Sequence, residues 1–235
     1  MDDKVFEVLR REYKYVVNAD KALEFQKQCD SVLKRDLHSH TAGYIVRSLY
    51  FDTIVNRDAY DKIDGSFERQ KLRLRVYGEE MENPKLELKM KKGEYQRKIS
   101  VSLSRQQAEA VAKGEFSVIL DTETEQAAEI YAAACMGYRP AAIIEYRRIA
   151  YLGSCPDTRI TLDKDIRSNE TTLDLFDKDA PMHPVLDVSR PPDTVIETKF
   201  AGDLEEYIRH IVASCGVSRY TFGKYAQGRS LLHYL

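Results

Sequence analysis

Residues 68–98 read ERQKLRLRVYGEEMENPKLELKMKKGEYQRK, with lysine or arginine at alternate positions and mostly leucine, valine or methionine between them. Successive side chains of a β-strand point to opposite faces, so this pattern predicts two neighbouring strands, each with one charged and one apolar face. Rows of like charge on adjacent strands repel one another. We therefore expect a strongly anionic ligand among these side chains. The cations of the pattern are Arg69, Lys71, Arg73, Arg75, Lys85, Lys89 and Lys91.

The composition favours one domain over residues 1–235, because 43% of the residues are hydrophobic and strand-rich barrels of this size are commonly single units. The net charge of -2 and the pI of about 6.3 argue against a generally basic protein that binds nucleic acid. Residues 69–98 nevertheless hold ten lysines and arginines against five acidic residues. Positive charge is thus concentrated at one place in the chain.

The cysteines and the apolar runs indicate a cytoplasmic protein. Cys29, Cys135, Cys155 and Cys215 are far apart and form no CxxC pair, so neither a zinc site nor a disulfide framework is expected. No run approaches the roughly 18 apolar residues that span a bilayer, and the first residues lack an apolar signal core. We expect no membrane segment in this chain.

The remaining sequence predicts about eight strands with interspersed helices, an α+β fold with a strong antiparallel component. The expected helices lie at residues 19–33, 56–63, 105–113, 124–136 and 203–215. The expected strands lie at residues 9–16, 43–53, about 68–77, about 85–92, 95–103, 142–152, 159–163 and 194–200.

The apolar faces of these strands need burial, and the amphipathic helices can cover them from the outside. If about eight strands close into a barrel, the charged faces then enclose a lumen wide enough for one small ligand. The same alternation recurs in the strands that carry Glu12 and Lys14, Arg159 and Asp163, and Glu197 and Lys199. The alternative is a twisted sheet whose charged face lies in solvent. In the barrel, the lumen would be lined by Arg73, Arg75, Lys89, Lys98 and their neighbours.

A chain of phosphates fits such a lumen, because one arginine can donate hydrogen bonds to two phosphate oxygens at once and lysine acts as a point charge. The ligand would then neutralise the cations. Three glutamates, Glu12, Glu87 and Glu197, are interleaved with them, and carboxylates of this kind suit Mg²⁺ or Mn²⁺ that also bridges phosphates. For Glu12 and Glu87, an ion pair with a neighbouring lysine is an equal alternative.

Several motifs in order along the chain resemble the polyphosphate polymerase domain of vacuolar transporter chaperone (VTC) proteins, within the triphosphate tunnel or CYTH superfamily. They are REYKY at 11–15, RSLYFDT at 47–53, KLRLR at 71–75, LELKMK at 86–91, YRRIAY at 146–151, RITLD at 159–163, IETKF at 196–200 and GKY at 223–225. The resemblance implies an antiparallel eight-stranded tunnel with helices packed on the outside. It also implies that basic walls bind triphosphate and polyphosphate, with Glu197 as the metal-binding carboxylate.

Two departures from that family pattern bear on the reaction. Hydrolytic members of the superfamily begin with ExExK, whereas this chain has Arg10, Glu12 and Lys14, which favours a polymerase-like member over a triphosphatase. The usual serine before the late Lys-Tyr pair is Gly223, which affects how Lys224 is positioned.

We therefore expect transfer of the γ-phosphate of a nucleoside triphosphate, ATP, to inorganic polyphosphate with Mn²⁺ or Mg²⁺. Arg73, Arg75, Arg148 and Arg159 would stabilise the transferring group, Lys14, Lys71, Lys89, Lys98, Lys199 and Lys224 would hold donor and chain, and Glu197 and Glu12 would hold the metal. Two alternatives stay open: a metal-dependent triphosphatase and a non-catalytic polyphosphate sensor. An RNA-binding module ranks last, because the alternation leaves few aromatic residues on the basic face for stacking.

Overall fold

The computed structural model describes residues 10–39, 42–93, 95–155, 157–185, 194–216 and 218–229. Its strands are β1 (Arg10–Val17), β2 (Lys34–Arg35), β3 (Tyr44–Asp52), β4 (Glu68–Tyr77), β5 (Glu82–Lys92), β6 (Tyr95–Ser102), β7 (Arg139–Leu152), β8 (Arg159–Asn169), β9 (His183–Pro184) and β10 (Thr194–Ala201). Its helices are α1 (Ala19–Val32), α2 (Arg57–Ile63), α3 (Arg105–Ala112), α4 (Glu125–Ala134), α5 (Glu206–Ser214) and α6 (Lys224–Gly228), with a 3₁₀ helix η1 (Phe116–Thr122).

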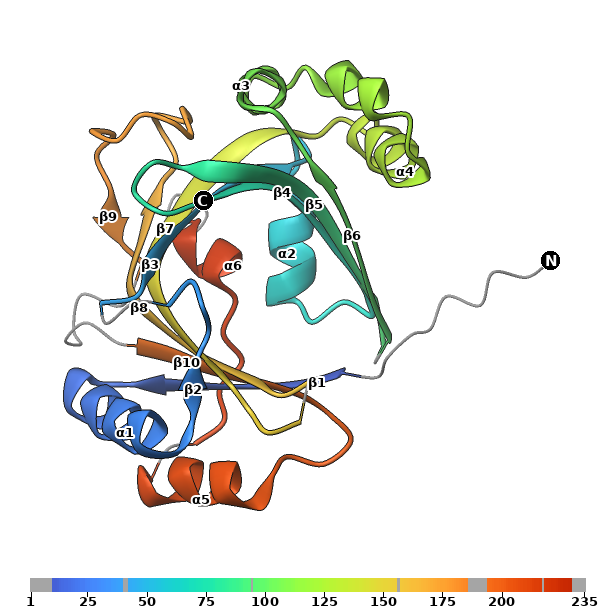
Figure 1. Cartoon of the computed structure of the whole chain (residues 1–235). Coiled ribbons are helices and arrows are strands. Elements are labelled where there is room, and N and C mark those ends of the chain that lie inside the picture. The colour runs from blue at the N-terminus through green and yellow to red at the C-terminus, as the bar shows by residue number, and fades with distance from the viewer. Residues whose placement is uncertain are drawn as a thin grey trace.

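Eight strands form one curled antiparallel sheet in the order β1-β10-β8-β7-β3-β4-β5-β6, as Figure 1 shows. The short strands β2 and β9 pair with β7 and β8. This confirms the predicted α+β class and antiparallel tunnel architecture. The outermost strands of the path are β1 and β6, and their ends lie on the two sides of the opening of the curl (Figure 1).

The apolar face of β4 and β5 is buried on the convex side of the sheet. Leu72, Leu74, Leu86 and Leu88 are almost fully buried there, in a core closed by α3, η1 and α4 (Figure 1). Burial of each such leucine stabilises the fold by about 1.5 to 3 kcal/mol. Ser104 caps α3, and Thr124 caps α4, by accepting a backbone hydrogen bond in the first turn. The helices predicted after residue 104 therefore cover the strands as expected.

A second core lies under α1 and α5, on the convex side of β1, β10 and β8. Phe25 and Cys29 of α1 and Ile208 of α5 are fully buried in it. Asn18 begins α1 by accepting a hydrogen bond from Lys21 N at 2.9 Å. This core holds in place the strands that carry Lys14 and Glu197.

Two short helices, α2 and α6, lie inside the curl, whereas α1, α3, α4 and α5 pack on its outside (Figure 1). The helix predicted at residues 56–63 is therefore present as α2, but it lies on the inner side and not on the outside as expected. Asp52 at the end of β3 fixes both of them. Its carboxylate accepts backbone hydrogen bonds from Asp58 at 3.0 Å and Ala59 at 3.1 Å in α2, and a hydrogen bond from the Tyr225 hydroxyl at 2.7 Å in α6. The ring of Tyr225 also stacks on Tyr50 of β3, with ring centroids 4.7 Å apart.

Most predicted element boundaries agree with the structure to within a few residues, and Leu9 of the first predicted strand lies outside the described ranges. One strand is clearly longer than expected, because β8 continues to Asn169 although its prediction ended at Asp163. Within the described residues, no helix is both long and apolar enough to cross a membrane.

Candidate functional site

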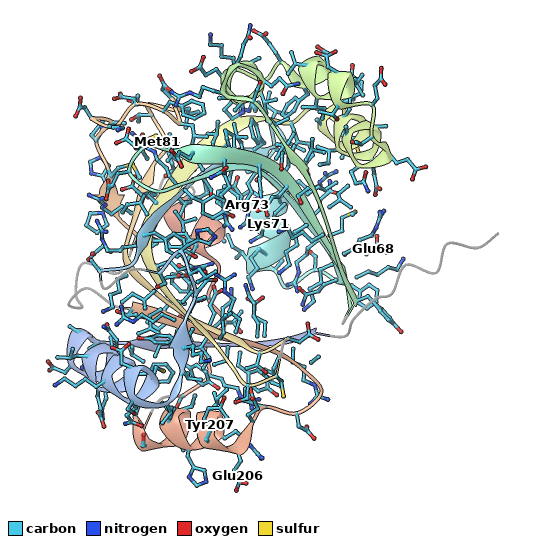
Figure 2. All side chains as sticks on the ribbon, in the orientation of Figure 1. Glu68, Lys71, Arg73, Met81, Glu206 and Tyr207 are labelled. Carbon is cyan, nitrogen blue, oxygen red and sulfur yellow. The ribbon has the colours of Figure 1, made fainter. Side chains whose placement is uncertain are left out.

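The concave side of the sheet borders a cavity of about 640 Å³. Seven basic side chains line it, against the single acidic side chain of Glu12. They come from the four elements β1, α2, β4 and β5: Arg11, Lys14, Lys62, Arg69, Lys71, Lys89 and Lys91. The sheet therefore directs the cations of β4 and β5 inward, as Figure 2 shows for Lys71 and Arg73, while Glu206 and Tyr207 of α5 lie on the outside.

Lys14 in the cavity lining contacts two glutamates, Glu12 of the lining and Glu197, which does not line the cavity. Lys14 Nζ lies 3.0 Å from Glu12 Oε1 and 3.4 Å from Glu197 Oε1 on the paired strand β10. Burial opposes the charge on Glu12, but Lys14 and Lys199 outweigh it and lower its pKa to about 2. Burial opposes the charge on Lys14 as well, and Glu197 and Glu12 together still raise its pKa. The lysine and both carboxylates are therefore charged at neutral pH.

A buried ion-pair network continues from Glu197 into the curl. Lys224 Nζ of α6 lies 2.8 Å from Glu197 Oε1 and 2.6 Å from Asp163 Oδ2. Arg148 donates two hydrogen bonds to the Asp163 carboxylate, at 2.6 and 2.7 Å. Burial disfavours the charge of Asp163, but Arg148 and Lys224 reverse this effect and lower its pKa. The neighbouring Arg147 is partly exposed and contacts Glu79 instead.

A second network surrounds Glu87 of β5. Arg73 Nε donates a hydrogen bond to Glu87 Oε2 at 2.7 Å, Lys98 Nζ lies 2.5 Å from Oε1, and Arg75 Nη1 lies 3.8 Å from Oε2. The register of the sheet produces this arrangement, because Arg73 and Glu87 are cross-strand partners. Burial opposes the charge on Glu87, yet the pKa is strongly lowered by Arg73 and Arg75. Glu87 therefore forms the predicted ion pairs with basic neighbours in this structure.

Three further predicted residues occupy different positions around the site. Lys199 Nζ lies 3.4 Å from Glu197 Oε2, and Lys89 Nζ lies 3.6 Å from Glu12 Oε2. Arg159, by contrast, donates hydrogen bonds to Asp36 at 2.8 Å and to the Tyr44 hydroxyl at 3.3 Å, and it does not line the cavity. Eleven of the twelve predicted residues thus lie on the cavity or in the two networks, and Arg159 lies apart with Asp36.

Two of these lysines have a strongly lowered pKa. Burial lowers the pKa of Lys71 to about 8, with Lys14, Lys62 and Lys89 contributing and Tyr50 opposing. Burial also lowers the pKa of Lys199 to about 8, against the opposing effect of Glu197 and Glu12. An anion close to either ammonium would restore its charge.

Sequence reasoning missed Lys62 as a cavity residue and Asp163 as a buried counter-ion. Lys62 lies in α2, where the strand alternation that revealed the other cations does not apply. Asp163 was visible in the alternation of β8, but the predicted strand ended at this residue, so its burial between β7 and β10 was not expected. The sequence analysis expected a bound ligand to neutralise the basic side chains. In the structure, three buried carboxylates already neutralise some of them: Glu87, Asp163 and Glu197.

The donor set around Lys14 suits a hard divalent cation. Glu12 and Glu197 supply ionised carboxylate oxygens on adjacent strands, and Mg²⁺ is commonly held by one or two carboxylates together with substrate phosphates and water. No group of three or more His, Cys, Asp or Glu suited to a metal occurs in the part of the chain that the structure describes. A metal here would therefore need water or phosphate oxygens to complete its coordination.

The solved structures that this chain resembles include three of low sequence identity. A candidate adenylate cyclase from Vibrio parahaemolyticus is 15% identical, with a TM-score of 0.48, over 93% of this chain and 96% of that one. A second candidate adenylate cyclase, from Bacillus halodurans, is 16% identical, with a TM-score of 0.49, over 89% and 90%. A protein from Pyrococcus horikoshii is 13% identical, with a TM-score of 0.49, over 96% and 100%.

The family follows from the sequence itself. Among curated proteins, none matches this sequence significantly. The VTC domain family, however, matches residues 9–233, which include every predicted site residue and both ion-pair networks. This match confirms the resemblance carried by the motifs at 11–15, 71–75 and 196–200. The chain belongs to the VTC domain family.

Proposed function

We propose that this chain is a phosphotransferase that moves the γ-phosphate of ATP onto the end of an inorganic polyphosphate chain. The observation that carries the proposal is the cavity of about 640 Å³, with seven basic residues and one acidic residue in its lining. A hollow with this charge attracts a linear polyanion and repels cationic substrates. Membership of the VTC family supports a triphosphate as the donor.

The residues of the cavity fit the limited demands of phosphoryl transfer, which depends mainly on positioning and charge stabilisation. The described residues of its lining include no serine, histidine or cysteine that could act as a covalent nucleophile. In the proposed reaction, an oxygen at the end of the acceptor chain attacks the γ-phosphorus, and the bond to the ADP leaving group breaks. Arg73, Arg75 and Arg148 would stabilise charge on the transferring group, and Lys14, Lys71 and Lys89 would hold the phosphates on either side of it.

Glu197 and Glu12 would hold the divalent cation, Mn²⁺ or Mg²⁺, beside Lys14. When bound, this ion would supply Lewis-acid charge to the phosphate groups. Lys14 would then stay close to both carboxylates and orient them toward the phosphates. Lys199 and Lys224 would keep Glu197 ionised, since both lie within 3.4 Å of its oxygens.

The products of ATP turnover test this proposal. Purified protein is incubated with ATP and either Mn²⁺ or Mg²⁺, and the products are sized on a gel and assayed for ADP. The proposal predicts a phosphate polymer together with ADP. Arg73→Ala is expected to reduce the rate by about 100-fold or more, because it removes charge stabilisation from the transferring group. Glu197→Gln is expected to abolish the increase in rate that added metal gives the unmodified protein.

Lys178→Ala is the matched control, since it removes a cation that pairs with Glu80 away from the cavity. Its rate should equal that of the unmodified protein. Release of orthophosphate without polymer would replace the proposal with a triphosphatase. Binding of polyphosphate with no turnover under either metal would replace it with a non-catalytic sensor.

A further inference from the structure

The cations around the cavity divide into two groups according to their counter-ions. The deep group is paired, because Glu87, Asp163 and Glu197 each lie within ion-pair distance of two or more basic side chains. Four other basic residues of the cavity lining have no carboxylate within 4.0 Å in the described ranges: Lys62, Arg69, Lys71 and Lys91. Lys71 lies next to the deep group, two residues from Arg73 on β4, and we call the other three, Lys62, Arg69 and Lys91, the rim cluster.

The rim cluster lies at the end of the β4–β5 pair. Arg69 is the second residue of β4 and Lys91 the second from the end of β5, and the two are directly opposite each other in the sheet. Lys62 is in the last turn of α2, inside the curl (Figure 1). Burial lowers the pKa of Lys62, and the charges of Arg69, Lys14 and Lys91 lower it further, so these cations lie within one another's electric field.

This arrangement works against stability. Like charges opposite each other on neighbouring strands are destabilising, and here no carboxylate compensates them within the described residues. At the deep cations, by contrast, carboxylates compensate the positive charge, as Glu87 does opposite Arg73. Uncompensated repulsion at a cavity wall points to an anion that comes from outside the protein.

The distance along the strand shows which part of an anion could reach the rim. Arg69 and Arg75 are six residues apart on β4, or about 20 Å in an extended strand. Three linked phosphates are shorter than this, so a triphosphate that contacts Arg73 and Arg75 cannot also reach Arg69. A longer phosphate chain can contact both.

We propose that the rim cluster is a second phosphate-binding subsite, which holds the part of a polyphosphate chain beyond the three phosphates at the deep cations. The inference rests on the proposed function in that it takes polyphosphate as the ligand. It adds that the protein discriminates by chain length, because only chains longer than tripolyphosphate gain the contacts with Lys62, Arg69 and Lys91.

A comparison of short and long chains tests the subsite. Affinities for tripolyphosphate and for a long-chain polyphosphate are measured by calorimetry at several salt concentrations. The long chain is expected to bind at least tenfold more tightly than tripolyphosphate. In the combined variant Lys62→Gln, Arg69→Gln, Lys91→Gln, this advantage should be lost, while the affinity for tripolyphosphate changes by less than about twofold. The salt dependence for the long chain should also fall, by about 0.7 per lost charge.

Two measurements separate binding from a structural role. Thermal unfolding of the combined variant should occur at the same or a higher temperature than that of the unmodified protein, because the change removes repulsion. Lys92→Gln is the matched control: it removes the adjacent cation, which pairs with Glu68 and does not line the cavity, and should leave both affinities unchanged.

The inference is overturned if the unmodified protein binds both chains equally, if the combined variant keeps its affinity for the long chain, or if single-stranded RNA displaces the long chain at equal phosphate concentration. The proposed function would fail on its own if the protein made no polymer from ATP but still bound the long chain more tightly than tripolyphosphate. Failure to bind either phosphate compound would overturn both.

Discussion

Glu12 Oε2 of β1 lies 3.6 Å from Lys89 Nζ of β5, so a side-chain pair joins two strands that share no backbone hydrogen bonds in the described part of the sheet. The same carboxylate contacts Lys14 at 3.0 Å through its other oxygen. Glu12 is therefore placed where it can serve either as a metal ligand or as a counter-ion. These two roles predict different effects of its removal.

Glu12→Gln should weaken Mn²⁺ binding in the presence of a non-hydrolysable ATP analogue by about tenfold or more, because one of two carboxylate ligands is lost. Isothermal calorimetry with Mn²⁺ measures the effect. Glu24→Gln, which alters an exposed pair with Lys21, is the control. Unchanged Mn²⁺ affinity together with tighter metal-free binding of tripolyphosphate would show that Glu12 is only a counter-ion.

The affinity for polyphosphate should decrease as the pH rises from about 7 to about 9. The reason is that Lys71 and Lys199, each with a pKa of about 8, lose their charge in this range when the site is empty, whereas a bound phosphate raises both pKa values. Binding should thus be strongest below pH 8 and should take up protons near pH 8. Calorimetry in two buffers of different ionisation enthalpy measures that uptake.

Lys71→Arg serves as the control for the pH dependence, since a guanidinium stays charged throughout this range. The variant should show a weaker decrease and a smaller proton uptake. An identical pH profile in the variant would exclude Lys71 as one of the titrating groups.

Asp163→Asn should reduce the free energy of unfolding by roughly 3 to 5 kcal/mol, because the buried charges of Arg148 and Lys224 lose their shared carboxylate. Urea unfolding at neutral pH measures the change. Asp203→Asn alters an exposed carboxylate that lies 3.7 Å from Arg11, and should change stability by less than about 0.5 kcal/mol. Equal stability of the two variants would contradict a structural role for the Asp163 network.

Tyr225→Phe should cost about 1 to 2 kcal/mol of stability, because Asp52 and Arg229 each lose a hydrogen bond of 2.7 Å to the buried hydroxyl. Since Tyr225 follows Lys224 in α6, the variant should also weaken tripolyphosphate binding. Tyr95→Phe, at an exposed ring, is the control for both measurements. A stable variant with unchanged binding would show that Asp52 is not needed to hold α6.

The alternation of charged and apolar residues in β4 and β5 predicted most of what is observed. It assigned Leu72 and Leu88 to the core and Arg73 and Lys89 to the concave side, because the two faces of a strand follow directly from residue parity. Helix caps such as Asn18 likewise determined where helices begin. These signals are local, and tertiary contacts do not change them.

The features that escaped prediction depend on contacts between distant residues. The helix α6 is only five residues long, too short for a helical period to show, and it is held by Asp52, which lies far away in the sequence. Strand β8 passes through Asp165, whose φ of 51° is normally a turn conformation, and then continues beside β7 with a shifted register. Arg159 had the right parity, but Asp36 binds its guanidinium.

The two outermost strands of the sheet affect how copies of this chain can associate. Edge strands present free N–H and C=O groups that can pair with a strand of another molecule, and charged side chains along an edge discourage such pairing. Arg11 on β1 and Arg97 and Lys98 on β6 stand at these edges. We therefore expect these charges to discourage edge-to-edge pairing between copies of the chain. On β1 the hydrogen bond from Tyr220 N to Lys14 O, at 2.8 Å, already occupies part of the edge.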